Sequence, residues 1–172
     1  MQITKPTYIV VELPVTVAEW VRSTRVTFEP AIAHLPAEIT LTGSSGVGPM
    51  KRGQSLALIE TCLKSALFGQ LPFESCFLDV NCFPGTDIFF ASPERARFDT
   101  LHASIVASGI EFEPSPYPYN PHCSLKGYTP LQPGQRKLIE SLAFPKHRFV
   151  MNEIAIYEMA GMTPKKLSSI TA

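Results

Sequence analysis

The 172-residue chain lacks the sequence features that mark membrane-spanning, secreted and broadly basic proteins. Its longest apolar runs, such as 8–11 and 88–91, are far shorter than the roughly 20 residues that span a bilayer. No basic segment followed by an apolar stretch opens the chain, so we expect no signal peptide. Its 15 basic and 15 acidic side chains give zero net charge. This balance argues against a broad nucleic-acid surface, because such binding uses many Lys and Arg contacts, but it is compatible with a small pocket for phosphate.

Cysteine is also sparse, and its spacing matches none of the common cysteine-dependent sites. The four cysteines include no Cys-x-x-Cys pair. The His and Cys residues likewise lack the spacing of a zinc site. We therefore expect reduced thiols, a cytoplasmic location, and neither a metal ion nor a cofactor.

What remains is the composition and patterning of a globular protein, with 45% hydrophobic and 17% charged residues. Alternating and β-branched runs predict strands, and helical periodicity predicts helices, with Thr16 and Ser92 as caps. The strands are expected at 7–13, 38–42, 73–83, 86–91, 121–125 and 149–159, and the helices at 17–25, 54–68, 92–108 and 133–142. Because these elements mix without a strict βαβ order, we predict an α+β fold of antiparallel sheet with outer helices. We expect one domain over residues 1–172 and favour a monomer.

Two short segments of the chain follow one pattern. Residues 38–43 read Glu-Ile-Thr-Leu-Thr-Gly, and residues 122–127 read His-Cys-Ser-Leu-Lys-Gly. Each has a proton-transfer side chain, a hydroxyl two residues later, and then Leu and Gly in matching places. On a strand, side chains two residues apart point the same way, roughly 6–7 Å from each other. Paired strands of this kind would present an acid–base group and a hydroxyl from each side of one groove, which suits a phosphate ester.

His122 and Glu38 are thus the candidate catalytic residues, and Thr40 and Ser124 are the candidate hydroxyls for phosphoryl oxygens. Histidine titrates near neutrality, and a well-placed proton transfer contributes roughly 10²–10⁴-fold to a rate. Lys126 has the same strand parity as His122 and Ser124. It is either a cation that faces the phosphate in the groove or an exposed lysine at a strand end.

Two tyrosines flank the second segment, Tyr119 before it and Tyr128 after it. Aromatic rings near a phosphate site can stack on a nucleobase, each contributing roughly 1–3 kcal/mol. Packing within the proline-rich stretch explains these rings equally well, so both interpretations stay open.

The two segments and the elements around them resemble the 2H phosphoesterase family, which includes bacterial 2′-5′ RNA ligase-like proteins and cyclic nucleotide phosphodiesterases. The resemblance covers most of the chain and rests on several stretches: Leu13-Pro14, 39–41, 54–68, 89–93, 101–102, 121–125 and 154–159. It implies two pseudo-symmetric lobes of antiparallel sheet with outer helices around a central groove. It also implies metal-independent cleavage of a 2′,3′-cyclic or 2′-5′ phosphodiester, with one motif residue as general base and the other as general acid. The implied partner is a nucleotide or an RNA end.

Glu38 departs from the family pattern, which has histidine at that place. In one interpretation, Glu38 replaces the histidine as proton carrier in an altered or impaired enzyme. In a second, hydrolysis is lost and the groove is a non-catalytic module that binds a nucleotide or another phosphate ligand. In a third, Glu38 faces a cationic or hydroxyl-bearing part of the ligand.

Overall fold

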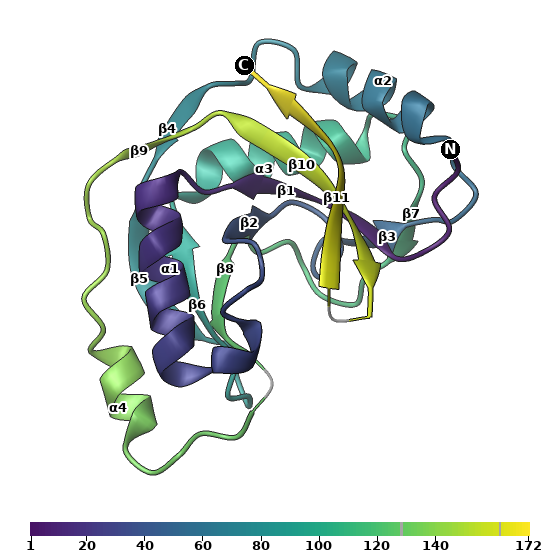
Figure 1. Ribbon diagram of the computed structural model, residues 1–172. Coiled ribbons are helices and arrows are strands. Elements are labelled where there is room, and N and C mark those ends of the chain that lie inside the picture. The colour runs from purple at the N-terminus through teal and green to yellow at the C-terminus, as the bar shows by residue number, and fades with distance from the viewer. Residues whose placement is uncertain (128, 162) are drawn as a thin grey trace.

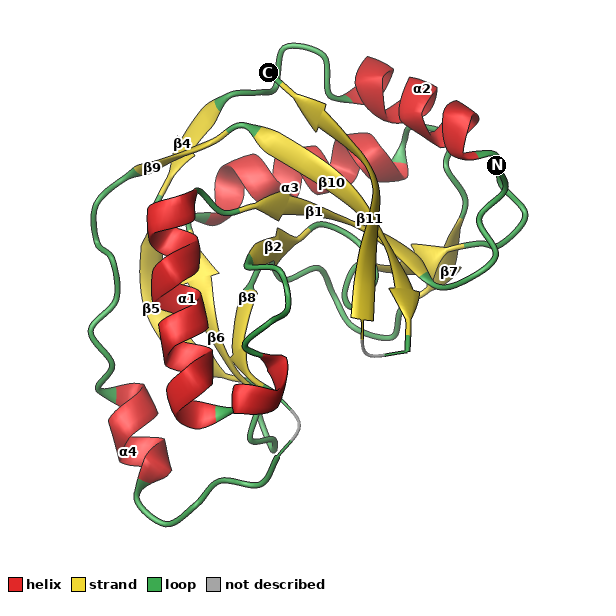
Figure 2. Cartoon of the chain, in the orientation of Figure 1, coloured by secondary structure: helices red, strands yellow, loops and turns green. Residues whose placement is uncertain are grey.

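The computed structural model has an α+β architecture in which strands from distant parts of the chain form antiparallel sheets with helices around them (Figure 1, Figure 2). It describes residues 1–127, 129–161 and 163–172. The strands are β1 (Thr7–Glu12), β2 (Glu38–Thr40), β3 (Val47–Met50), β4 (Phe73–Ser75), β5 (Phe77–Cys82), β6 (Phe89–Pro93), β7 (Phe112–Pro114), β8 (Cys123–Lys126), β9 (Phe149–Met151), β10 (Glu153–Ala160) and β11 (Thr163–Thr171). The helices are α1 (Val15–Phe28), η1 (Pro30–Ile32), α2 (Leu56–Ala66), α3 (Arg95–Val106) and α4 (Gln135–Glu140). Within these described residues, no helix has both the length and the apolar character needed to cross a bilayer.

The largest sheet has the strand order β11-β10-β1-β2, and its neighbouring strands are antiparallel. Side chains alternate across it, as strand geometry requires. Ile9 and Val11 enter the main core, which also contains the apolar side chains of α3, and α3 runs behind β1 and β10 in Figure 1. Val10 lies on the other face with Tyr157, and Tyr8 packs against them. The alternation therefore directs Tyr8 away from the main core.

A second sheet has the order β5-β6-β8, with α1 packed on β8 and α4 near β5. The two sheets meet where β2 approaches β8. There the backbone N–H of Thr40 donates to the carbonyl of His122 at 3.2 Å. This bond places the two similar sequence segments side by side, although they are far apart along the chain.

Two helix starts differ from the sequence prediction. Thr16 lies inside α1, and the residue before the helix is Pro14, which makes no side-chain capping bond. Ser92 and Pro93 belong to β6, and α3 begins only at Arg95. Ser92 pairs with Asp79 of β5. Sheet pairing thus extends over residues whose types alone favour a helix start.

Candidate active site

A cavity of about 420 Å³ lies at the junction of the two sheets, and both sequence segments line it. Glu38 and Thr40 come from β2, while Ser124 lies in β8 and His122 immediately precedes it. The structure therefore brings the two candidate proton-transfer residues and the two candidate hydroxyls to one groove. The other polar groups on its lining include further hydroxyls and the guanidinium of Arg25.

His122 is held in a defined orientation at the edge of β8. Its Nδ1 lies 2.7 Å from the carbonyl oxygen of Asn120, so Nδ1 carries the proton and donates it, and Nε2 keeps a free lone pair. The rings of Phe83 and Phe90 meet the imidazole edge-on, with centroids 5.3 and 5.6 Å away. Burial lowers the pKa of His122 below its ordinary value of 6.5, although the bond to Asn120 opposes this shift. The imidazole is therefore neutral at neutral pH and equipped to accept a proton.

The pKa of Glu38 is shifted in the opposite direction. Its Oε2 is buried and has no hydrogen-bond partner within the described part of the chain. Burial raises the pKa of Glu38 to about 8. Arg25 opposes the rise, and Glu12, its cross-strand neighbour on β1, adds to it. The carboxyl is therefore protonated at neutral pH and can donate a proton.

These two shifts give the groove a neutral base and a neutral acid at the same pH. An ionised Glu38 would repel an anionic phosphodiester by about 4 kcal/mol at 4 Å and an effective dielectric constant near 20. A protonated Glu38 removes that repulsion and offers an O–H donor instead. The arrangement is suited to proton transfer on both sides of a phosphate ester.

Arg25 is a residue of the site that the sequence interpretation missed. It lines the cavity from α1, and its side chain is nearly buried, with 3% exposure. Nε and Nη2 donate to the carbonyl of Ser124 at 3.0 and 2.8 Å. Nη1 donates to the carbonyls of Leu35 and Pro36 at 2.9 and 3.1 Å. Arg25 thus ties β8 to the segment before β2. Arg25 lies one helical turn after Val21, on the apolar face of α1. A charged residue on that face is the one signal in the sequence that could have revealed its role.

Removal of the Arg25 charge is expected to raise the pKa of Glu38 above about 8, because that charge is what lowers it. Arg25→Met should shift the titration of the Glu38 carboxyl upward, as followed by ¹³C NMR. Arg25→Lys keeps the positive charge and should leave the midpoint close to the wild-type value. An unchanged or lower midpoint in Arg25→Met would contradict this electrostatic role.

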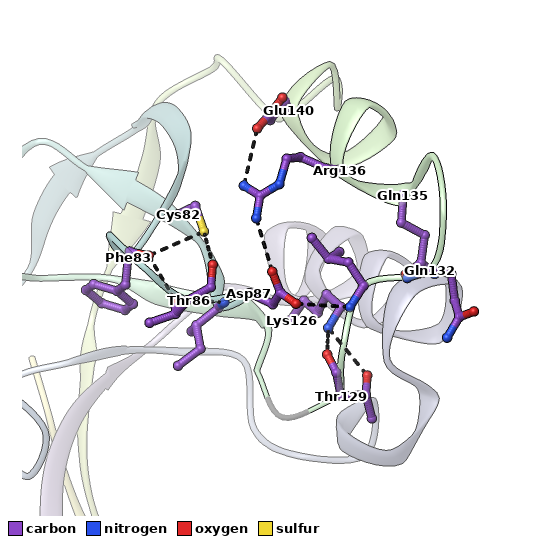
Figure 3. A network of polar contacts seen from close by, with 12 residues as sticks. Cys82, Phe83, Thr86, Asp87, Lys126, Thr129, Gln132, Gln135, Arg136 and Glu140 are labelled. Carbon is purple, nitrogen blue, oxygen red and sulfur yellow. Dashed lines mark hydrogen bonds and ion pairs between the residues drawn. The ribbon is translucent and has the colours of Figure 1, made fainter.

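The structure corrects the expected place of Lys126. Its side chain is 1% exposed and lies 3.9 Å from the carboxylate of Glu29, whose side chain is equally buried. The Lys126 ammonium also donates to the carbonyl and the hydroxyl of Thr129 (Figure 3). The parity argument was wrong because the pairing of β6 with β8 shifts register: Phe90 pairs with Ser124, but Phe89 pairs with Lys126. Such a bulge turns the next side chain away from its expected face.

The sequence left two interpretations open for Tyr119, stacking on a base or packing within the protein. Tyr119 lies parallel to His102, with ring centroids 3.9 Å apart, and its hydroxyl donates to the carbonyl of Thr40 at 3.1 Å. It is not part of the cavity lining, so the structure gives it a packing role behind β2. Tyr128 lies outside the described residues.

The described residues contain no group of three or more His, Cys, Asp or Glu side chains arranged to hold a metal ion. The polar side chains that line the groove are a carboxyl, an imidazole, a guanidinium and several hydroxyls. These are groups that transfer protons and hydrogen-bond to the oxygens of a phosphate ester.

Comparisons with known proteins agree with the α+β fold expected from the sequence. A family model of the 2′-5′ RNA ligase superfamily matches residues 13–162. E. coli LigT complexed with 3′-AMP is 17% identical over 97% of each chain, with a TM-score of 0.57. A protein of Thermus thermophilus is 16% identical over 99% of this chain and 97% of that chain, with a TM-score of 0.66. The search of curated protein sequences gives no match. At these identities the solved structures establish the fold alone, but the family model spans most of the sequence, and the chain therefore belongs to the 2′-5′ RNA ligase superfamily.

Proposed function

We propose that this protein is a metal-independent phosphodiesterase that acts on a 2′,3′-cyclic or 2′-5′ phosphodiester of a nucleotide or RNA end. The observation that carries the proposal is that Glu38 and His122 line one cavity, where burial raises the pKa of the carboxyl and lowers that of the imidazole. His122 acts as general base and Glu38 as general acid. Membership of a superfamily of phosphoesterase type supports the reaction class.

In the proposed step, His122 takes up one proton and Glu38 releases one. The Nε2 lone pair of His122 takes a proton from the attacking water, whose oxygen forms a bond to phosphorus. The bond from phosphorus to the leaving oxygen breaks, and Glu38 delivers its proton to that oxygen. His122 is then an imidazolium and Glu38 a carboxylate, and proton exchange with solvent restores both.

The hydroxyls supply the remaining stabilisation. Thr40 and Ser124 follow Glu38 and His122 by two residues and line the same cavity, so each is placed to donate to a non-bridging phosphoryl oxygen. Such donors stabilise the charge that develops there during displacement. Hydrogen bonds from the Arg25 guanidinium to the Ser124 carbonyl hold this segment in place for that role.

The proposed ligand is a nucleotide or an RNA end. E. coli LigT, which shares the fold, has been solved with 3′-AMP, with ATP and with NADP+. We extend nucleotide binding to this chain because its groove offers both proton-transfer groups and apolar walls. We further propose that the protein is cytoplasmic and monomeric and that it acts without a cofactor.

Glu38→Gln tests the general acid directly. Glutamine has nearly the same shape but no transferable proton, so kcat should fall by about 10²–10⁴-fold. Hydrolysis of 2′,3′-cyclic AMP and of 2′-5′-linked ApA is to be followed in the presence of a chelator. Glu38→Asp is the matched variant that keeps a carboxyl.

The same assay separates an enzyme from a non-catalytic binding module. If the wild type turns over neither substrate while Glu38→His does so readily, the working-enzyme proposal fails and the groove is a ligand-binding remnant. If the wild type is active and Glu38→Gln retains full activity, Glu38 is not the acid.

A further inference from the structure

The cavity has apolar walls on two sides of its polar centre. One wall comes from β1, β3 and the β10–β11 hairpin, and the other comes from η1 and the turn between β5 and β6. Each wall holds one half-buried aromatic ring that lines the cavity, Tyr8 on the first and Phe83 on the second. The phosphate-binding centre is thus flanked by two rings rather than one.

Tyr8 is held on the first wall by the strand that carries it. The alternation along β1 directs its ring to the groove face, where it stacks on Tyr157 with centroids 6.0 Å apart and an interplanar angle of 23°. Gly43 gives it room, because a Cβ at that position would lie 2.8 Å from the Cβ of Tyr8. Gly43 also has φ of +110°, which glycine adopts without strain. Gly43, the last residue of the first sequence segment, therefore allows Tyr8 to occupy this position.

Phe83 is held on the second wall by its neighbours. Its ring lies 4.2 Å from that of Phe90 and meets the imidazole of His122 at 87°. It is therefore in contact with the residue proposed to act as general base. Ile32 and Ile88 line the same side of the cavity, so this wall is apolar around the ring.

We propose that the groove takes a linear phosphodiester between two nucleosides, with one base stacked on Tyr8 and the other on Phe83. The inference rests on the proposed function, since it places the phosphate between Glu38 and His122. A 2′,3′-cyclic mononucleotide carries a single base and leaves one wall uncovered. A dinucleotide covers both, and each stacked base strengthens binding by about 5- to 150-fold.

The test compares three probes on the full chain: 2′-5′-linked ApA, 3′-AMP and inorganic phosphate. Dissociation constants are to be measured by calorimetry, or kcat/KM where the diester is hydrolysed. Tyr8→Leu and Phe83→Leu keep an apolar side chain and remove the ring. Each should weaken ApA by about 5- to 150-fold, and Tyr8→Leu should leave inorganic phosphate unchanged. Tyr8→Phe, which keeps the ring, should bind ApA as the wild type does. Tyr117→Leu is the control, because Tyr117 is 67% exposed and lies outside the cavity lining.

The outcomes separate this inference from the proposed function. Binding of 3′-AMP and phosphate, with ApA no tighter than 3′-AMP, would overturn the two-sided groove and leave the phosphate site standing. The two-sided groove is equally overturned if either leucine variant leaves ApA binding unchanged. If none of the three probes binds the wild type, the proposed function falls together with the inference.

Discussion

Substitution of His122 by alanine is expected to lower kcat/KM for a phosphodiester by about 10²–10⁴-fold, the usual contribution of a well-placed general base. The carbonyl of Asn120 fixes the proton on Nδ1, so Nε2 is the nitrogen that accepts a proton from the attacking group. His34→Ala is the matched control, because His34 is exposed and lies outside the cavity lining. A loss of only a few-fold in His122→Ala, with the fold intact, would remove His122 from the chemistry.

The pH profile reports both groups at once. His122 acts as a base only when it is deprotonated, and burial lowers its pKa below 6.5. The acidic limb of kcat/KM should therefore have its midpoint below pH 6.5. An acid with a pKa of about 8 is active only while protonated, so the alkaline limb should fall near pH 8. Residual activity in His122→Ala should lose the acidic limb, and that in Glu38→Gln should lose the alkaline one. An alkaline limb that persists in Glu38→Gln would assign it to another group.

Much of the framework was readable from local sequence. The β-branched run at 7–13 contains β1, and the predicted strands at 73–83 and 86–91 overlap β5 and β6, which pair with each other. The repeated pattern at 38–43 and 122–127 led to the two strands that meet at the cavity. Strand alternation and turn residues are local properties, so one sequence is enough to reveal them.

The residues that were misplaced depend on contacts between distant elements. Lys126 was assigned to the groove by parity, and a register shift between β6 and β8 removes that parity. For Tyr119 the sequence left base stacking and packing open, and the structure shows packing, because α3 brings His102 against its ring. Arg25 was passed over because its position on the apolar face of α1, the one local signal, does not show that three carbonyls from β8 and the segment before β2 converge on it. Tertiary structure decides each of these cases, and no local pattern encodes it.

The largest effect on stability is expected from Lys126→Met. Lys126 and Glu29 form a buried pair, and Glu29 also accepts hydrogen bonds from the backbone N–H groups of Gly127 and Thr129. Methionine fills much of the lysine volume but removes the Lys126 charge from beside the buried Glu29 carboxylate. Loss of one partner from such a pair costs about 3–5 kcal/mol. Urea unfolding should show this as a lower midpoint.

Two comparisons make that result specific. Lys5→Met removes an ion pair with Glu158 in which the lysine is half exposed, so its cost should stay within about 1 kcal/mol. The double variant Lys126→Met with Glu29→Gln removes both charges. It should recover much of the stability lost in Lys126→Met, because the charge of the buried Glu29 carboxylate causes most of that loss. If Lys126 instead served a bound phosphate, Lys126→Met would unfold at the same urea concentration as Lys5→Met and would weaken inorganic phosphate binding. The unfolding midpoint therefore decides between a structural lysine paired with Glu29 and a ligand-binding one in the groove.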